Sequence, residues 1–509
     1  MKIETANKEN DDDEICSQKH SIKGSDEQRT PWPSVCLSFL VQTLNGIQFS
    51  IYITSMWPYL TTLEPNAGLS FFGWIMSIYS IGQMFSSWIF GFWNQKTMST
   101  KHPAAFGLAF TALGNVIYGL LPLLPSYQAW FMLMARFLAG FGSGTLSVIR
   151  SYCAMASVAK DRAKVMSLAV GSFVLGLSLG PSIQSIFIPI GKDGISIGPI
   201  ILNMYTAPAF LMVFISLGSI FLLMFCFVER YSGIISSEEK SDPYLVIPKF
   251  DRIAAVVCIY LYFLLQLAGT SLEVMSTPLT ISLYNWPNAK ALFYNGTLQT
   301  IACSIDIVVY LLISFSRLGS LDKRIMLLIS LSCFIIYQIF TLPWPFYEGP
   351  LDYIELGNFD ACVTYSPNST VEDTAYSGGC YRRYAWCAHT KRVPLPIYAF
   401  GYTIVLAIAF PFLAAPVGIL FSEVLGPRKQ GVMQGVNEIG GCIARCITPI
   451  IQSMLFESSG YIFPVLMNLT LLAAGLLSMI VFYGRMTPLK MKPNIGVATP
   501  YKKGVFYRF

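Results

Sequence analysis

Twelve apolar stretches, each long enough to cross a lipid bilayer, divide this chain of 509 residues. A helix rises about 1.5 Å per residue, so roughly 20 apolar residues cross a hydrocarbon core about 30 Å thick. A backbone in lipid must satisfy its own hydrogen bonds, which favours helices over open strands. The sequence therefore predicts an all-α membrane protein with twelve transmembrane helices. The candidate spans are residues 34–60, 69–93, 104–124, 128–150, 165–189, 204–228, 253–278, 290–314, 325–346, 394–421, 431–455 and 461–484.

The charge composition agrees with a membrane protein. Charged residues make up 12% of the chain, against about 25% in soluble domains. The net charge is +6, but the basic residues lie in loops, where they set membrane topology, and they do not indicate a nucleic-acid partner. The expected partner is the lipid bilayer.

Basic residues occupy alternate loops, and this pattern predicts the orientation. Loops 61–68 and 122–127 contain no Lys or Arg, whereas the loops on the other side are basic. The positive-inside rule places that basic side, and both termini with it, in the cytosol. The residues concerned are Lys96, Lys101, Lys160, Arg162, Lys164, Arg317, Lys323, Arg324, Arg428 and Lys429.

The chain divides into two halves of six spans each. Residues 34–228 form the first half, a polar linker covers 229–252, and residues 253–484 form the second half. The polar tails 1–33 and 485–509 are expected to be disordered and cytosolic. Two six-helix bundles related by an axis along the membrane normal are typical of secondary transporters.

The long loop 347–393 is expected to face the lumen. It contains the glycosylation pattern Asn368-Ser369-Thr370 and three cysteines, and both glycans and disulfides form on the non-cytosolic side. Cys380 and Cys387 are close in sequence and are the expected disulfide. Cys362 is then either a free thiol or an alternative partner.

Two helix motifs resemble those of the major facilitator superfamily. Arg136-Phe-Leu-Ala-Gly140-Phe-Gly142-Ser-Gly144 resembles its arginine-and-glycine motif, and Gly176-Leu-Ser-Leu-Gly180-Pro181 resembles its Gly-x-x-x-Gly-Pro motif. Glycines on one helix face permit close helix packing, and proline bends a span. The family's motif between the second and third spans is matched poorly, because Gly91-Phe-Trp-Asn-Gln-Lys96 lacks the acidic residue of its charge lock.

Further segments resemble an endolysosomal branch of this superfamily linked to ceroid lipofuscinosis. The resemblance implies a lysosomal or late endosomal membrane and the movement of chloride or another small solute. The acidic dileucine signal usual near the N-terminus of that branch is missing from this chain. The segments are Ser55-Met-Trp-Pro-Tyr-Leu60, Ser80-Ile-Gly-Gln-Met84, Asn203-Met-Tyr-Thr206, Pro278-Leu-Thr280, Tyr294-Asn-Gly296 and Ala385-Trp-Cys387.

Polar residues recur at helical spacing in several spans, at positions that do not suit lipid contact. The resemblance to the superfamily implies that the first, fourth, seventh and tenth spans line a central cavity. Polar stripes follow three of these spans, and another follows the eighth. The candidate cavity or substrate residues are Gln42, Asn45, Arg136, Arg150, Gln266, Glu273, Asp306, Tyr402 and Arg445.

The charged candidates each leave an alternative open. Glu273 is either a proton or cation site or a structural partner, and Arg136 and Asp306 have structural alternatives as well. Arg150 lies near the cytosolic end of its span, where its side chain can reach the interface. We hypothesise that Glu273 and Arg136 approach each other when the lumenal side is closed, and that an acidic lumen protonates Glu273 and releases Arg136 for an anion. Glu438 and Arg445 share a helix face, but a rise of about 10 Å disfavours a direct pair.

No enzyme site, cofactor motif or metal site is expected. A phosphate-binding loop with Lys-Ser/Thr is missing from the sequence, and the three histidines lie outside the spans. The expected function is transport of a small solute or anion such as chloride by alternating access, with proton coupling left open. The alternatives are a chloride channel on the same fold and a non-transporting membrane scaffold or receptor.

Overall fold

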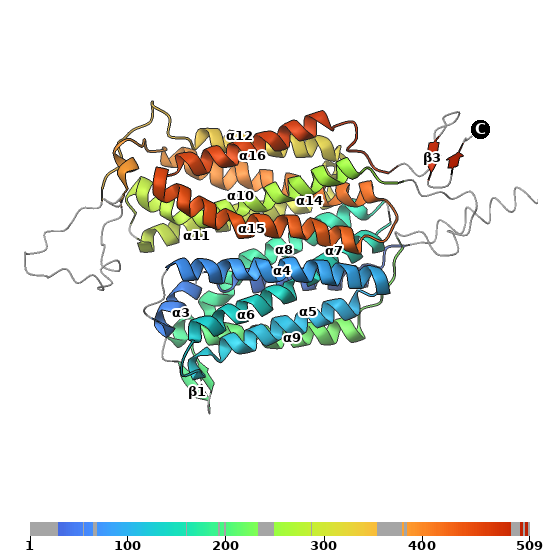
Figure 1. Cartoon of the computed structure of the whole chain (residues 1–509), viewed down its shortest axis with the longest axis horizontal. Helices are drawn as coiled ribbons and strands as arrows, with labels where there is room; N and C mark the ends of the chain where they lie inside the picture. The colour runs from blue at the N-terminus through green and yellow to red at the C-terminus, as the bar shows by residue number, and fades with distance from the viewer. Residues whose placement is uncertain are drawn as a thin grey trace, which may run out of the picture.

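The computed structural model describes residues 29–489 apart from 54, 65–68, 159, 192–193, 198–199, 233–248, 287, 354–378 and 381–383, and also residues 499–501 and 504–506. Long helices run nearly side by side along one axis (Figure 1). The first half of the chain forms one group of helices and the second half forms the other. The predicted all-α membrane fold of two six-helix bundles is confirmed.

The first half contains helices from α2 to α9 and one short hairpin. The hairpin strands β1 (Ile195–Ile197) and β2 (Ile200–Leu202) pair antiparallel before the last helix. The helices are α2 (Trp32–Ser50), α3 (Met56–Leu63), α4 (Leu69–Thr97), α5 (Lys101–Gly119), α6 (Gln128–Ser143), α7 (Thr145–Ala156), α8 (Arg162–Ile186) and α9 (Thr206–Phe225).

The second half contains helices from α10 to α16. Its tenth predicted span is built from three consecutive pieces, of which η7 is a π-helix. The helices are α10 (Arg252–Tyr284), α11 (Asn288–Phe315), α12 (Lys323–Phe340), α13 (Leu395–Phe400), η7 (Gly401–Val405), α14 (Leu406–Leu425), α15 (Gly431–Ser459) and α16 (Ile462–Val481).

Each of the twelve predicted stretches contains helix in the described residues. Nine helices of this described part are long and apolar enough to cross a membrane. The helices α2, α4 and α5 fall outside that group because Ser, Gln, Asn and Gly interrupt their apolar sequence. The fourth span is divided into α6 and α7 at Gly144.

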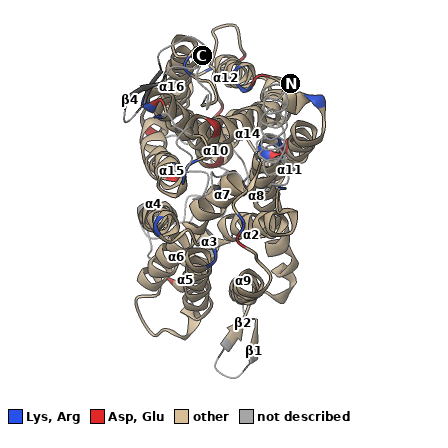
Figure 2. Ribbon diagram, turned by 90° about the vertical axis from the view of Figure 1, so that its right-hand side faces the viewer, with Lys and Arg blue, Asp and Glu red and all other residues tan. Residues whose placement is uncertain are grey.

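The two ends of the bundle differ. We call the end with residues 29–31 and 486–489 the termini side, and the end with the described parts of 341–394 the loop side. Figure 2 views the molecule from the termini side and shows the helices nearly end-on in two groups. The halves meet along two seams, one between α4 and α15 and one between α8 and α11.

Each half has its own buried core. Residues of the second half alone, including Leu261, Phe334 and Leu413, form the largest cluster. A separate cluster of the first half includes Tyr52 and Met132. Because each half buries apolar surface internally, each can move as a unit against the other.

The motif glycines lie where helices within a half touch. A methyl group at Gly140 would overlap the backbone of Tyr79 on α4, and one at Gly144 would overlap Ser86. Gly176 and Gly180 of α8 meet α2 in the same way, at Thr43 and Ser50. Pro181 follows inside α8. These glycines therefore permit backbone contact between neighbouring spans.

The loop-side segment is tied to the second half. Cys380 and Cys387 form a disulfide with a Cα–Cα distance of 6.3 Å. The Asp352 carboxylate accepts hydrogen bonds from Arg392 at 2.6 Å and from Asn285 at 2.7 Å. These contacts, with Arg392 as the larger cause, lower the pKa of Asp352. Asn368 and Cys362 lie outside the described residues.

The predicted tails and linker are described only in part. Within residues 485–509, expected to be disordered, β3 (Thr499–Tyr501) and β4 (Gly504–Phe506) pair as two antiparallel strands. This differs from the expectation, because short runs close in sequence can pair locally without a core. At the start of the linker, Glu229 accepts hydrogen bonds from the backbone N–H groups of Thr100 and Lys101, both at 2.6 Å.

Candidate functional site

A buried ion pair joins the two halves on the termini side of the bundle. Arg150 of α7 forms an ion pair with Glu438 of α15. The Arg150 guanidinium also donates to the Tyr262 hydroxyl of α10 at 2.7 Å, and that hydroxyl lies 3.1 Å from both Glu438 oxygens. Gln266 donates to the same hydroxyl at 3.0 Å. We call Arg150, Tyr262, Gln266 and Glu438 the cross-half cluster.

Arg150 was a candidate cavity residue whose side chain could alternatively reach the membrane interface. In the structure its side chain is only 10% exposed, and that of Glu438 only 1%. A buried charge needs a partner, and the nearest carboxylate comes from the other half of the chain. Removing one partner from a buried pair typically costs about 3–5 kcal/mol. The cluster therefore favours the arrangement in which the halves are closed here.

Arg445 lies deeper than this cluster, roughly 21 Å along α15 from the termini side. Its guanidinium donates to the Gln83 amide of α4 at 2.9 Å and lies 5.4 Å from the ring centroid of Phe49. The ion pairs found in the described part of the chain do not include Arg445. As expected, it does not pair directly with Glu438.

Glu273 of α10 lies further toward the loop side. Its side chain is exposed, although the residue is deep within the span. Arg445 is the cation within electrostatic range of its carboxylate. The hypothesised approach of Glu273 to Arg136 is not present in this structure, which places Arg136 in the interior of the first half. The exposed carboxylate therefore lies nearer the loop side of the bundle than Arg445 does.

Arg136 is surrounded by aromatic rings of the first half. Its guanidinium carbon lies 4.6 Å from the ring centroid of Tyr79 and 5.7 Å from that of Tyr52. The residue is 3% exposed and belongs to none of the ion pairs of the described residues. Ring faces, which attract cations weakly, are therefore the groups that stabilise its charge in the described residues.

A third polar group lies in the second half, beside the π-helix. The Tyr402 hydroxyl of η7 donates to the Gln299 amide oxygen of α11. Both Glu273 and Asp306 lie within electrostatic range of Tyr402. Asp306 is buried, and its Oδ1 atom has no hydrogen-bond partner in the described residues. Single-turn π-helices frequently mark functional positions in helices.

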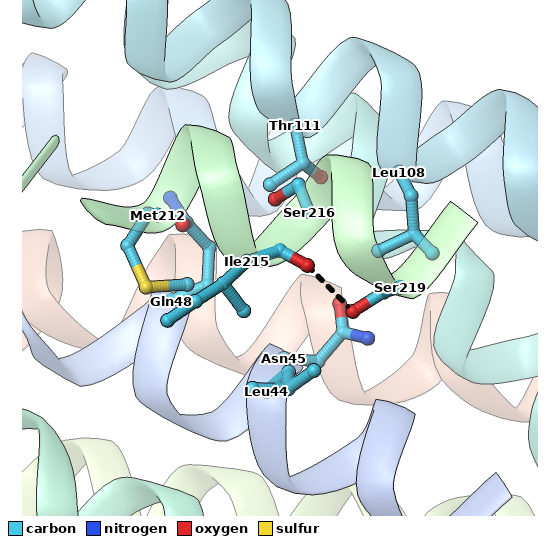
Figure 3. Close-up of a pocket in the computed structure, with 9 residues that line it drawn as sticks. All are labelled: Leu44, Asn45, Gln48, Leu108, Thr111, Met212, Ile215, Ser216 and Ser219. Atoms are coloured by element: carbon cyan, nitrogen blue, oxygen red, sulfur yellow. Dashed lines mark hydrogen bonds between the residues drawn. The ribbon is translucent and has the colours of Figure 1, made fainter. Parts of the chain in front are cut away.

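Gln42 and Asn45 face the interior of the first half and not the seam. Gln42 contacts the Cys153 sulfur at 3.9 Å, and Asn45 donates to the Val41 carbonyl. Asn45 also lines a cavity of about 10 Å³ between α2, α5 and α9 (Figure 3). That volume holds about one water molecule, so it is not a solute site. These two residues are corrected from cavity lining to internal packing.

A hydrogen bond to a neutral side chain closes the termini side, in the segment where the family motif has an acidic residue. Gln95, in the segment that lacks the family's acidic residue, accepts a hydrogen bond from the Val432 N–H at 2.9 Å. Val432 lies in the first turn of α15, where free N–H groups carry partial positive charge. A methyl group added to Gly91 would lie 2.6 Å from the Gly431 carbonyl, so the two backbones touch.

A carboxylate at this position should strengthen the closure. We expect Gln95→Glu to stabilise the termini-closed state by about 0.3–1 kcal/mol, because an anion at a helix N-terminus is favourable. Transport should slow about twofold to fivefold while binding from the loop side is retained. Flux and labelling of a buried seam cysteine measure the two effects. Thr97→Glu, which adds a charge at the exposed end of α4, is the control, and equal effects of both variants would contradict this role.

In the described residues, no three or more His, Cys, Asp or Glu side chains are grouped to hold a metal ion. The arrangement instead provides the Arg445 cation where the halves meet, the Glu273 carboxylate nearer the loop side, and bonds that close the termini side. Such an arrangement can bind a solute between the halves and alternate its exposure.

Sequence comparison identifies the class of protein. The family model of the Major Facilitator Superfamily matches residues 38–370. The chain therefore belongs to the Major Facilitator Superfamily, whose members are membrane transporters.

Two kinds of relative agree with this assignment. Major facilitator superfamily domain-containing protein 8 of Xenopus laevis is 28% identical over 92% of this chain and 98% of its own length. Among solved structures, the human organic anion transporter MFSD10 matches with a TM-score of 0.58 and 13% identity, covering 88% of this chain and 99% of its own. FucP in its outward conformation matches with a TM-score of 0.57 and 14% identity, over 89% and 99% of the two chains.

Several residues of the site were not among the candidates that the sequence indicated. Glu438 and Tyr262 belong to the cross-half cluster, and Gln83 and Gln95 bond across the same seam. Glu438 had a usable signal, since a carboxylate within a span requires a partner. Gln83 and Gln95 offered only a polar side chain in an apolar helix.

Proposed function

We propose that this protein transports a small anionic solute across an endolysosomal membrane by alternating access, with the termini side in the cytosol. The observation that supports this proposal most directly is the position of Arg445. Its guanidinium is a buried cation where the two halves meet, and the residue to which it donates across the seam, Gln83, is a neutral amide. Arg150 is neutralised by Glu438, so Arg445 retains its charge for a ligand.

The pattern of closure supports alternating access. The bonds across the halves run from Gln95–Val432 on the termini side to Gln83–Arg445 in the middle. Glu273 and Gln299, further toward the loop side, are exposed. This pattern supports a carrier that is closed on the termini side, which the proposal assigns to the cytosol, and that is open toward the loop side.

Proton coupling is part of the proposal. Glu273 lies within electrostatic range of Arg445, so its ionised form competes with an anionic ligand for the same cation. Protonation of Glu273 from an acidic lumen releases Arg445 for that ligand. This replaces Arg136 by Arg445 as the arginine coupled to Glu273.

The names of the relatives are consistent with this class of solute. The matched human protein is described as an organic anion transporter. The endolysosomal location rests on the sequence resemblance to that branch of the family.

A flux assay with purified protein in vesicles tests the proposal. Chloride, organic anions, sugars and amino acids are compared with and without a pH gradient, and an anion should be moved. Arg445→Gln should reduce its flux at least tenfold, and Arg445→Lys should retain part of it. Arg485→Gln, which affects a more exposed ion pair with Asp251, is the matched control.

The same assay distinguishes the alternatives. Currents that far exceed carrier turnover and vary linearly with driving force would indicate a chloride channel. Absence of flux for every solute, with Arg445→Gln still functional in cells, would indicate a scaffold or receptor.

A further inference from the structure

The interior of the first half contains a group of hydrogen-bond donors without acceptors. Arg136 of α6 is 3% exposed, and its Nε and Nη1 atoms have no hydrogen-bond partner in the described residues. The buried hydroxyls of Tyr118 and Tyr59 are likewise unpartnered there. We call Arg136, Tyr118 and Tyr59 the donor cluster.

The three residues come from different elements, and Tyr118 is the neighbour of both Arg136 and Tyr59. The Tyr118 hydroxyl is within electrostatic range of the Arg136 guanidinium. The rings of Tyr59 and Tyr118 are 5.3 Å apart between centroids, and both are at most 2% exposed. Tyr118 lies at the loop-side end of α5, and Arg136 lies near the middle of α6.

The surroundings do not supply the missing acceptor. The nearby Asn115 amide oxygen already accepts from Gln48 at 3.0 Å and from Tyr52 at 2.7 Å. The ion pairs of the described residues do not provide Arg136 with a carboxylate. Leaving several buried donors and a buried charge unsatisfied is costly.

We propose that the donor cluster is the binding site of a small monovalent anion of the halide class, held within the first half. A guanidinium and two hydroxyls can all donate to one spherical acceptor, and the anion also neutralises the arginine. A water molecule can also bond to these groups, because tyrosine hydroxyls accept as well as donate, but it leaves the charge of the arginine uncompensated.

This site is separate from the proposed transport site. Arg445 lies at the seam between the halves, whereas the residues of the donor cluster lie on α3, α5 and α6 of one half. The anion is therefore resident: it ties three elements of the loop side together and stabilises the first half. The inference goes beyond the proposed function and stands without it.

Thermal unfolding of the purified full-length protein tests the site. Sodium chloride and sodium bromide are titrated against sodium gluconate at constant ionic strength. We expect halide, but not gluconate, to raise the melting temperature in a saturable manner. Tyr118→Phe and Tyr59→Phe, which keep the rings, should each weaken the apparent halide affinity about fivefold to tenfold.

Two control variants test whether the halide response comes from this site. Tyr205→Phe alters a ring stacked on Tyr59 at 4.8 Å, whose hydroxyl is bonded to Thr62, and should retain the wild-type halide response. Arg445→Gln should retain it as well, even if transport is lost. Coinciding halide and gluconate curves, or wild-type affinity in the Tyr59→Phe/Tyr118→Phe double variant, would overturn the proposal.

Discussion

Glu438→Gln should shift the protein from the termini-closed to the termini-open state and reduce transport by at least tenfold. The substitution leaves the Arg150 guanidinium buried without its counter-charge. Breaking a buried pair in this way costs about 3–5 kcal/mol, and every 1.4 kcal/mol changes an equilibrium about tenfold. The closed state loses this energy, whereas the open state hydrates the freed arginine.

Accessibility of a seam cysteine measures the shift. Ser87 of α4 is 0% exposed at the seam with α15. A Ser87→Cys variant should be labelled slowly from the termini side in the wild-type background and rapidly with Glu438→Gln. The double reversal Arg150→Glu/Glu438→Arg should restore part of the protection and of the flux.

Tyr262→Phe gives a graded comparison for the same cluster. It removes one hydroxyl but keeps the ion pair, so it should destabilise the termini-closed state by about 1 kcal/mol. Asp322→Asn removes an ion pair with Arg324 outside the seam and should leave labelling unchanged. If the cysteine of Ser87→Cys is labelled no faster together with Glu438→Gln than together with Asp322→Asn, the cross-half cluster does not hold the halves together.

Glu273→Gln should flatten the dependence of transport on lumenal pH. In the wild type, acidification should accelerate anion uptake from the lumen several-fold, because it neutralises the carboxylate within electrostatic range of Arg445. The amide is neutral at every pH, so the variant should transport at neutral pH about as fast as the wild type does in acid. The variant should also favour the loop-side-open state.

Asp352→Asn is the matched control on the loop side. Contacts with Arg392 and Asn285 lower the pKa of Asp352. A lowered pKa means that the carboxylate and its contacts persist above its ordinary value, about 3.9, and are lost only in stronger acid. Asp352 therefore does not titrate between pH 4.5 and 7.5, about the range of such an assay, and its variant should keep the wild-type pH profile. A wild-type profile in Glu273→Gln would show that Glu273 is structural.

Local sequence features determined much of the fold. Apolar stretches of sufficient length predicted every helical span, because crossing a bilayer depends on the residues of one segment alone. The glycines of α6 and α8 predicted close helix packing for the same reason. The family resemblance correctly indicated the fold, which the family match and the structural neighbours support.

The partners of the polar residues required the tertiary structure. Helical phase gave a common face to Gln42 and Asn45 but could not show that this face meets α5 and α9 within one half. It also suggested that Arg136 approaches Glu273 when the lumenal side is closed. In this structure, tyrosines surround Arg136, and Arg445 is within electrostatic range of Glu273.

What the sequence alone determined is therefore where the spans lie and which residues must avoid lipid. Only the tertiary structure decided which of these residues meet. Arg150 and Glu438 are 288 positions apart, and Gln95 and Val432 are 337 apart. Contacts of this kind depend on how two independently packed halves dock, and no periodicity within one helix encodes that docking.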